Sequence, residues 1–98
     1  MKESTIQRQI IAYLREQGFL VWKISDRFRS GIPDLYCCRG VKDGAWKVSF
    51  WLEVKRPGGK VTALQAHEIA ELRAQGVGAW VVSSVDMVAA ILDAAMRP

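Results

Sequence analysis

Hydrophobic residues recur along this chain with two different periods, and the changes of period mark out its expected elements. Apolar residues that return every three or four positions predict a helix with one buried face, whereas alternating or continuous apolar residues predict a strand. The helical stretches cover residues 4–17, the segment from a cap at Thr62 to about Gln75, and a last segment that follows Ser83 or Ser84. The strand-like stretches cover residues 19–25, about 34–39, about 46–55 and 78–83.

The first helix has a stop signal and a narrow apolar stripe. Gly18 supplies the residue type that commonly ends a helix, and Ser4 or Thr5 is expected to cap its start. Glu3 lies at this start, where the helix dipole favours an acidic side chain, and that is a sufficient reason for its presence. The stripe expected to face the core consists of Ile6, Ile10, Tyr13 and Leu14.

The second and third helices begin with similar signals. Thr62 and Gln65 have the spacing of a capping box, which by itself explains Gln65, and Gly76 marks the end of the second helix. Ser83 or Ser84 is expected to cap the third. The inward positions are expected at Ala66, Ile69, Ala70 and Leu72 in the second helix and at Val85, Val88, Leu92 and Ala95 in the third.

The strand at residues 46–55 is apolar on one face and becomes charged at the end of the other. Alternate residues of a strand point to opposite faces of the sheet, so a sheet built this way holds a core on one side and a polar site on the other. The apolar face is formed by Trp46, Val48, Phe50 and Leu52, and the opposite face by Lys47, Ser49, Trp51, Glu53 and Lys55.

The order of the elements, α-β-β-β-α-β-α, predicts one α/β domain that spans residues 1–98. The first three strands suit an antiparallel meander, with Asp43-Gly44 as the hairpin signal between the second and third. The second helix then crosses over to a fourth strand parallel to the third. We therefore expect a four-stranded mixed sheet flanked by helices, with an extra helix at the C-terminus.

Composition and charge narrow the class of protein. Half of the 98 residues are hydrophobic, enough for a core without disulfides, and no stretch approaches the ~20 apolar residues of a membrane span. The N-terminus lacks the apolar core of a signal peptide, which predicts a cytoplasmic protein. The net charge of +4 favours anionic partners such as nucleic acid. Arg27 and Arg29 flank Phe28 in a polar turn, which suits a phosphate-holding loop and an ordinary solvated turn about equally.

Three charged residues lie in apolar, strand-like surroundings, where charge needs a reason. Glu53 and Lys55 share one strand face, and Asp34 opens the preceding apolar run. If these two runs pair, two carboxylates and an ammonium group converge, and close carboxylates repel each other unless a cation lies between them. All-oxygen ligands suit Mg²⁺ or Mn²⁺. The pattern predicts a metal-dependent site that acts on phosphate.

The same residues carry a resemblance to a known family. The run Gly31-Ile32-Pro33-Asp34-Leu35, followed by Glu53-Val54-Lys55, resembles the signature of the PD-(D/E)XK nuclease superfamily. The downstream run Gly59-Lys60-Val61-Thr62-Ala63-Leu64-Gln65 is similar to that of the VRR-NUC family, the virus-type replication-repair nuclease domain. The likeness extends from Glu3 to the fourth strand. One departure is Thr62-Ala63, where family members often carry Ser-Pro, and a capping threonine there replaces a capping serine.

The resemblance implies a restriction-endonuclease-like fold with an αβββαβ core. It implies metal ligands at Asp34, Glu53 and the Val54 backbone carbonyl, and it adds Glu3 and Gln65 to the catalytic site. Glu3 is expected to hold either a metal-bound water or a second ion. Single-domain relatives come from phages and prophages and resemble dimeric nucleases acting on four-way DNA junctions. We accordingly expect a homodimer that recognises branched DNA and needs Mg²⁺ or Mn²⁺ but no small-molecule cofactor.

On this interpretation Lys55 stabilises charge on the attacked phosphate, or orients or deprotonates the attacking water. Arg27, Arg29, Arg56 and Lys60 are expected to hold flanking phosphates. No element is arranged to read base edges, which predicts recognition of DNA shape. Two alternatives remain: a flap or nicking nuclease of the same fold, and a non-catalytic DNA-binding module.

Overall fold

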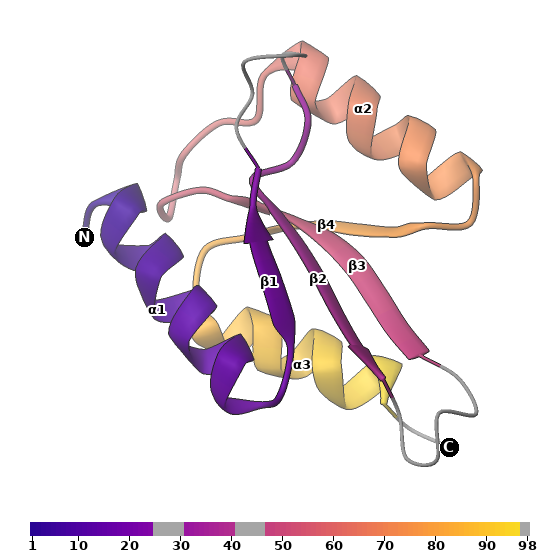
Figure 1. The fold of residues 1–98 in the computed structure, drawn as a ribbon. Coiled ribbons are helices and arrows are strands. Elements are labelled where there is room, and N and C mark those ends of the chain that lie inside the picture. Colours follow the sequence, from indigo (N-terminus) through magenta and orange to yellow (C-terminus); the bar gives the residue numbers. More distant parts are fainter. Residues whose placement is uncertain (25–30, 41–46, 97–98) are drawn as a thin grey trace.

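The computed structural model describes residues 1–24, 31–40 and 47–96, and it contains the expected elements in the expected order (Figure 1). The helices are α1 (Glu3–Glu16), α2 (Ala63–Ala74) and α3 (Val85–Ala95). The strands are β1 (Leu20–Lys23), β2 (Leu35–Gly40), β3 (Lys47–Val54) and β4 (Gly78–Val82). Within the described ranges, none of the helices has the length and apolarity needed to cross a membrane.

The strands form one mixed sheet in the order β1-β2-β3-β4. β1, β2 and β3 pair antiparallel, and β4 joins β3 in parallel after the α2 crossover. Leu35 pairs with Leu52, so the start of β2 lies beside the end of β3. This topology confirms the predicted fold class, a four-stranded mixed α/β sheet flanked by helices with a further helix at the C-terminal end. The predicted hairpin signal Asp43-Gly44 lies outside the described residues.

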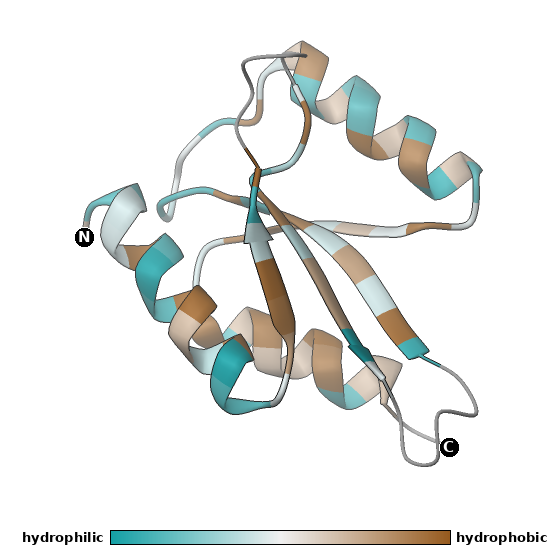
Figure 2. Ribbon diagram, viewed as in Figure 1, coloured by the Kyte–Doolittle hydropathy of each residue, from teal (hydrophilic) through white to brown (hydrophobic). Residues whose placement is uncertain are grey.

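The hydrophobic core lies between the sheet and the two helices α1 and α3, which cover the same face of the sheet (Figure 1). Figure 2 shows that α3 is largely apolar, whereas α1 and α2 carry polar residues along much of their length. The predicted stripe of α1 and the apolar face of β3 both point into this core, while Trp46 of the predicted strand face lies outside the described residues. Its members include Ile6, Ile10, Leu14, Val21, Leu35, Cys37, Val48, Phe50, Leu52, Val54, Val88 and Leu92.

The helix ends follow the predicted signals with one exception. Gly18 and Gly76 have φ angles of +87° and +80°, the left-handed conformation that ends a helix at low cost when the residue is glycine. Ser84 caps α3, because its hydroxyl accepts a hydrogen bond from the Met87 amide at 3.2 Å. The predicted cap of the first helix at Ser4 or Thr5 is wrong. Both residues lie inside α1, which begins at Glu3 without a side-chain cap, so packing of its apolar stripe holds this helix.

The predicted inner face of α2 is partly wrong. Ile69 is buried as expected, but Ala66 and Ala70 are exposed and the acidic Glu68 is buried instead. The helix packs on the sheet face opposite α1 and α3, mainly against β4, where the Arg73 side chain donates to the Ala79 carbonyl at 2.9 Å. Alanine is found on both the buried and the exposed faces of helices, so the spacing of Ala66 and Ala70 did not identify the face of α2 that contacts the sheet.

Gly31 holds the loop before Asp34 close against α2. Its φ angle is +88°, and a Cβ atom at this position would lie 2.7 Å from Leu64 Cγ and 3.1 Å from Glu68 Cγ. Gly31→Ala should therefore destabilise the fold by about 2 kcal/mol or more, from backbone strain and the clash together. Gly58→Ala is the matched control, because φ is +79° there but no atom lies within 4 Å, so strain alone applies. Urea unfolding should rank the two variants in this order, and equal losses would contradict the tight contact.

Candidate active site

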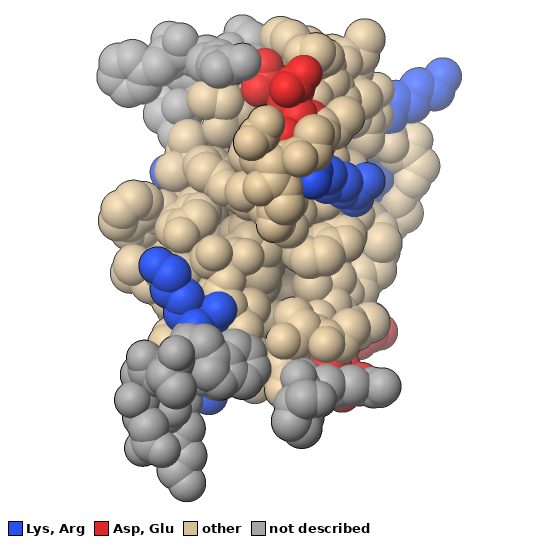
Figure 3. All heavy atoms as spheres, turned by 90° about the vertical axis from the view of Figure 1, so that its right-hand side faces the viewer, with Lys and Arg blue, Asp and Glu red and all other residues tan. Residues whose placement is uncertain are grey.

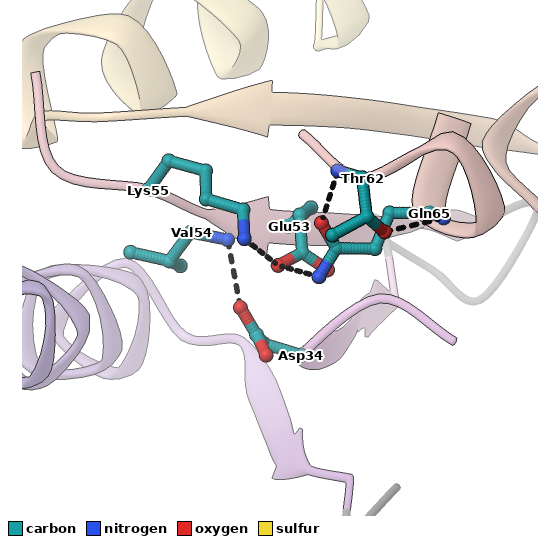
Figure 4. Close-up of polar contacts among 6 residues, drawn as sticks. All are labelled: Asp34, Glu53, Val54, Lys55, Thr62 and Gln65. Carbon is teal, nitrogen blue, oxygen red and sulfur yellow. Dashed lines mark hydrogen bonds and ion pairs between the residues drawn. The ribbon is translucent and has the colours of Figure 1, made fainter. Parts of the chain in front are cut away.

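Asp34 is held at the start of β2 by bonds to both neighbouring strands. Its backbone carbonyl accepts from the Ile24 amide at 2.8 Å, and its side-chain Oδ2 accepts from the Val54 amide at 2.9 Å (Figure 4). The preceding Pro33 is fully buried, so the backbone approaching Asp34 is fixed as well. One carboxylate oxygen of Asp34 is thus committed to β3, and this bond orients the other.

Glu53 lies at the end of β3 and is only 2% exposed. Its Oε2 accepts a hydrogen bond from Gln65 Nε2 at 3.3 Å and forms an ion pair with Lys55 Nζ at 3.7 Å. Its Oε1 is buried and makes no hydrogen bond with the described part of the chain. Figure 4 shows Asp34, Lys55 and Gln65 arranged around this carboxylate. The structure therefore brings these side chains together on the α2 side of the sheet.

The pKa of Glu53 is raised to about 8. Burial is the largest cause, followed by repulsion from Asp34 and by a hydrogen bond to Asp34 that forms only when Glu53 carries a proton, with Lys55 acting in the opposite direction and Glu3 adding a small repulsion. The two carboxyl groups are thus close enough to share a proton. Without a cation, the pair retains that proton at neutral pH, because burial and mutual repulsion both disfavour a second negative charge.

Gln65 performs both of the roles that its position suggests. Its Oε1 accepts from the Thr62 amide at 3.0 Å and its own amide donates to Thr62 Oγ1 at 3.1 Å, which completes the capping box of α2. Its Nε2 remains available and donates to Glu53. One side chain therefore ties the start of α2 to the carboxylate at the end of β3.

Gln65→Glu separates these roles, because glutamate keeps the capping oxygen but loses the donor to Glu53 and adds a third acid. For the DNA cleavage that the sequence predicts, we expect kcat/KM to fall by at least about 10-fold, the usual order for a hydrogen bond to a charged group. Thr62→Ala is the control, since it removes the cap, costs about 1 kcal/mol of stability and leaves the donor in place. If Thr62→Ala impaired cleavage as strongly as Gln65→Glu, Gln65 would act only through the helix start.

The donor set fits a hard divalent cation. Glu53 Oε1 is a buried oxygen without a hydrogen-bond partner in the described structure, and Asp34 presents a second carboxylate beside it. A cation between them would supply the missing partner and relieve the repulsion. No cluster of three or more His, Cys, Asp or Glu side chains occurs among the described residues. Glu3 is thus near enough to affect the pKa of Glu53 but does not complete a three-residue ligand set.

The predicted DNA-contacting residues lie around this centre or outside the described ranges. Arg56 and Lys60 are exposed in the connection between β3 and α2, which joins Lys55 to the Thr62 cap. Arg27 and Arg29 fall within residues 25–30 and so lie outside the described structure.

Sequence reasoning missed two residues beside the site. Trp51 and Glu68 line a cavity, together with Ile32, Pro33 and Leu72, and Pro33 directly precedes Asp34 in the chain. Trp51 could have been identified, because it precedes Glu53 by two positions and shares its strand face. Glu68 gave no such signal, because an acidic residue in a helix is normally expected on the solvent-exposed face.

The comparisons with known proteins agree with this geometry. The sequence matches the VRR-NUC domain family model over residues 3–86. A solved structure described as a VRR_NUC domain superposes with a TM-score of 0.76 at 29% sequence identity, covering 93% of this chain and 94% of that chain. No curated protein matches the sequence. Because the family model covers most of the chain, this protein belongs to the VRR-NUC domain family and is a nuclease of the PD-(D/E)XK type.

Proposed function

We propose that this protein is a Mg²⁺- or Mn²⁺-dependent endonuclease that cuts branched DNA, with four-way junctions as its preferred substrate. The observation that carries the chemistry is the pair formed by Asp34 and Glu53. Glu53 Oε1 is buried without a hydrogen-bond partner among the described residues, and the Lys55 amine lies 3.7 Å from Oε2 of the same carboxylate. The preference for four-way junctions rests on the resemblance to single-domain family members.

Asp34 and Glu53 would hold the metal ion, with the Val54 carbonyl as a neutral ligand. A bound divalent ion would neutralise phosphate charge and activate water for attack. Glu53 keeps the Lys55 amine at the centre through its ion pair, and Gln65 keeps Glu53 in place. The Lys55 side chain is 14% exposed, and its amine can then face the non-bridging oxygens of the phosphate, where negative charge grows as the bond breaks. Glu3 would orient a water at the edge of this centre.

The positive side chains around the centre would bind the flanking backbone. Arg56 and Lys60 are exposed and follow Lys55 in the chain, and Arg27 and Arg29, which lie outside the described residues, precede Gly31 in the sequence. Phosphate contacts position a nuclease without reading sequence. We therefore expect affinity to fall steeply with salt and cleavage to depend on the shape of the DNA.

An apolar row on the open sheet face supports a homodimer. Trp22 and Leu20 on the edge strand β1 are 56% and 52% exposed. Tyr36 packs against Trp22 at 5.9 Å between ring centroids and against Trp51 at 5.1 Å, which continues the row across the sheet. The side of the molecule shown in Figure 3 is largely uncharged, with scattered Lys, Arg, Asp and Glu side chains. Multi-angle light scattering should give twice the chain mass, and a monomer at micromolar concentration would exclude the dimer.

A panel of labelled DNAs tests the substrate. Four-way junctions, flaps, nicked duplexes and linear duplexes should be compared with Mg²⁺, with Mn²⁺ and with EDTA. Paired incisions in the junction, at a kcat/KM about 10-fold or more above that of the other DNAs, would support the proposal. A flap cut fastest would favour the flap nuclease of the same fold. Binding without cleavage in either metal would favour the non-catalytic module.

A further inference from the structure

A small cavity lies between the sheet and α2, and several of its lining residues neighbour the carboxylate centre in the chain. It measures about 190 Å³ and is lined by Ile32, Pro33, Trp51, Glu68 and Leu72. Its walls are firmly placed. Pro33 is fully buried, Trp51 packs against Tyr36 at 5.1 Å, and Gly31 keeps the loop in close contact with α2.

Three of the residues that line the cavity lie close in the chain to residues of the candidate active site. Pro33 directly precedes Asp34, and Trp51 lies two residues before Glu53 on the same strand face, a separation of about 7 Å. On α2, Glu68 follows Gln65 by three residues, which is nearly one helical turn. A group bound in the cavity would therefore belong to a nucleotide adjoining the phosphate that the acids and Lys55 face.

The residues that line the cavity favour the binding of a flat, uncharged group. Among the described residues, the five that line it include no cation, and most of their surface is apolar, which suits a flat ring better than a phosphate. An indole and three aliphatic side chains offer apolar surface, and the buried Glu68 adds a carboxylate. Glu68 already makes a polar interaction of its own, but a carboxylate has about four acceptor positions and can accept more than one hydrogen bond. The volume is below the ~300 Å³ at which small-molecule sites begin, which suits a single ring system.

We propose that this cavity receives one nucleobase of the DNA, taken out of the base stack beside the cleaved phosphate. Trp51 stacks on the base and Glu68 accepts from its N–H groups. The inference rests on the proposed nuclease function and adds to it a base-binding site. It also gives a reason for cutting branched DNA, because bases at a branch point are unstacked at lower cost than bases inside a duplex.

The first experiment combines a protein change with a DNA change. The cleaved phosphate is mapped with the native protein on one branched DNA, and the nucleotide on each side of it is replaced in turn by an abasic analogue. At one of these positions loss of the base should lower kcat/KM by about 10-fold, within the range known for base stacking on aromatic rings. Trp51→Leu should cause a similar loss on intact DNA and almost none on that abasic DNA.

Trp80→Leu is the matched control, because Trp80 is also half-buried but lies on the core side of the sheet, against Phe50. Any effect of this variant should be the same with and without the base. If Trp51→Leu does not fold, Leu72→Phe replaces it, since phenylalanine would fill the cavity from α2 and leave Trp51 untouched. Equal losses for Trp51→Leu on intact and abasic DNA, or no abasic position with an effect, would overturn the proposal.

A second readout needs binding but no cleavage. 2-Aminopurine is placed at the same position, and its fluorescence is measured with protein in EDTA. The base should be brighter when bound to Trp51→Leu than when bound to the native protein, because it leaves the stack in both and the indole quenches it only in the native protein. Emission equal to that of free DNA in both would overturn the base site, even if no DNA were ever cleaved. A fall in the particle mass of Trp51→Leu in light scattering would instead assign the cavity to a contact between two copies of the chain.

Discussion

Glu53→Gln is expected to abolish DNA cleavage and at the same time to stabilise the metal-free protein above neutral pH. Glutamine has nearly the same shape and keeps an oxygen that can accept from Gln65 Nε2, but it carries no charge. In the native protein this 2% exposed carboxyl group faces Asp34, and together burial and repulsion raise its pKa to about 8. Removing the charge therefore removes a cost of folding and the proposed metal ligand together.

The direction of the pH dependence follows from the raised pKa. Glu53 titrates near 4.5 when unfolded and near 8 when folded, so between these values the folded state holds a proton that the unfolded chain has released. The stability from this group is complete below pH 4.5 and is lost as the pH rises to about 8. The Glu53→Gln variant keeps this contribution to stability at every pH, because its side chain does not ionise. Its advantage in free energy of unfolding should grow to on the order of 4 kcal/mol at pH 8.

Urea unfolding in EDTA at pH 5, 6.5 and 8 measures this advantage, and a difference that stays constant with pH would contradict it. Adding Mg²⁺ at pH 8 should narrow the gap, because a cation stabilises the ionised pair in the native protein and has one carboxylate fewer to bind in the variant. The native protein should also release a proton when the metal binds at neutral pH, which calorimetry in buffers of different ionisation enthalpy detects.

Cleavage should fall at least about 1000-fold in this variant, since a bound metal supplies several kcal/mol of transition-state stabilisation. Asp34→Asn is the companion change, because its side-chain oxygen can still accept from the Val54 amide. Both variants should bind junction DNA as tightly as the native protein or more tightly, since each loses a negative charge that faces phosphate. Cleavage at a tenth of the native rate or more would remove Glu53 from the ligand set.

Short sequence patterns were sufficient to predict most of the helices and strands. Gly18 and Gly76 end helices because their left-handed conformation favours glycine. The alternation along β3 assigns Phe50 and Leu52 to the buried face without any knowledge of how the sheet packs. The convergence of Asp34 and Glu53 needed one further assumption, that β2 pairs with β3, and the short connection between them made this pairing the simplest one.

The parts that sequence alone did not give depend on packing between distant segments. Thr62 and Gln65 read as a capping box, but only the folded chain shows that the same amide also donates to Glu53. The buried face of α2 and the cavity beside Trp51 arise because the loop at Gly31 contacts the helix. Neither feature can be predicted from the periodicity of polar and apolar residues along the chain.

Lys55→Ala is expected to lower kcat by about 100- to 1000-fold, the size usually found when one preorganised group that stabilises developing charge is removed. The Lys55 amine lies 3.7 Å from Glu53 Oε2, and its charge lowers the pKa of Glu53 against the opposing effects of burial and Asp34. The substitution therefore has two consequences. It removes a positive group facing the phosphate, and it weakens metal binding by favouring the protonated form of Glu53.

The two consequences separate with pH and metal concentration. At pH 9.5 and saturating Mg²⁺, the high pH and the bound cation both favour the ionised form of Glu53, so we expect the metal site to be filled even without Lys55. A deficit in kcat that persists there belongs to the contact between the amine and the phosphate. Recovery of the native rate would instead limit Lys55 to holding Glu53 in its charged form. Lys55→Arg refines the distinction, since arginine keeps the charge at every pH but cannot accept a proton from water, so a rate restored by arginine would exclude Lys55 as the general base.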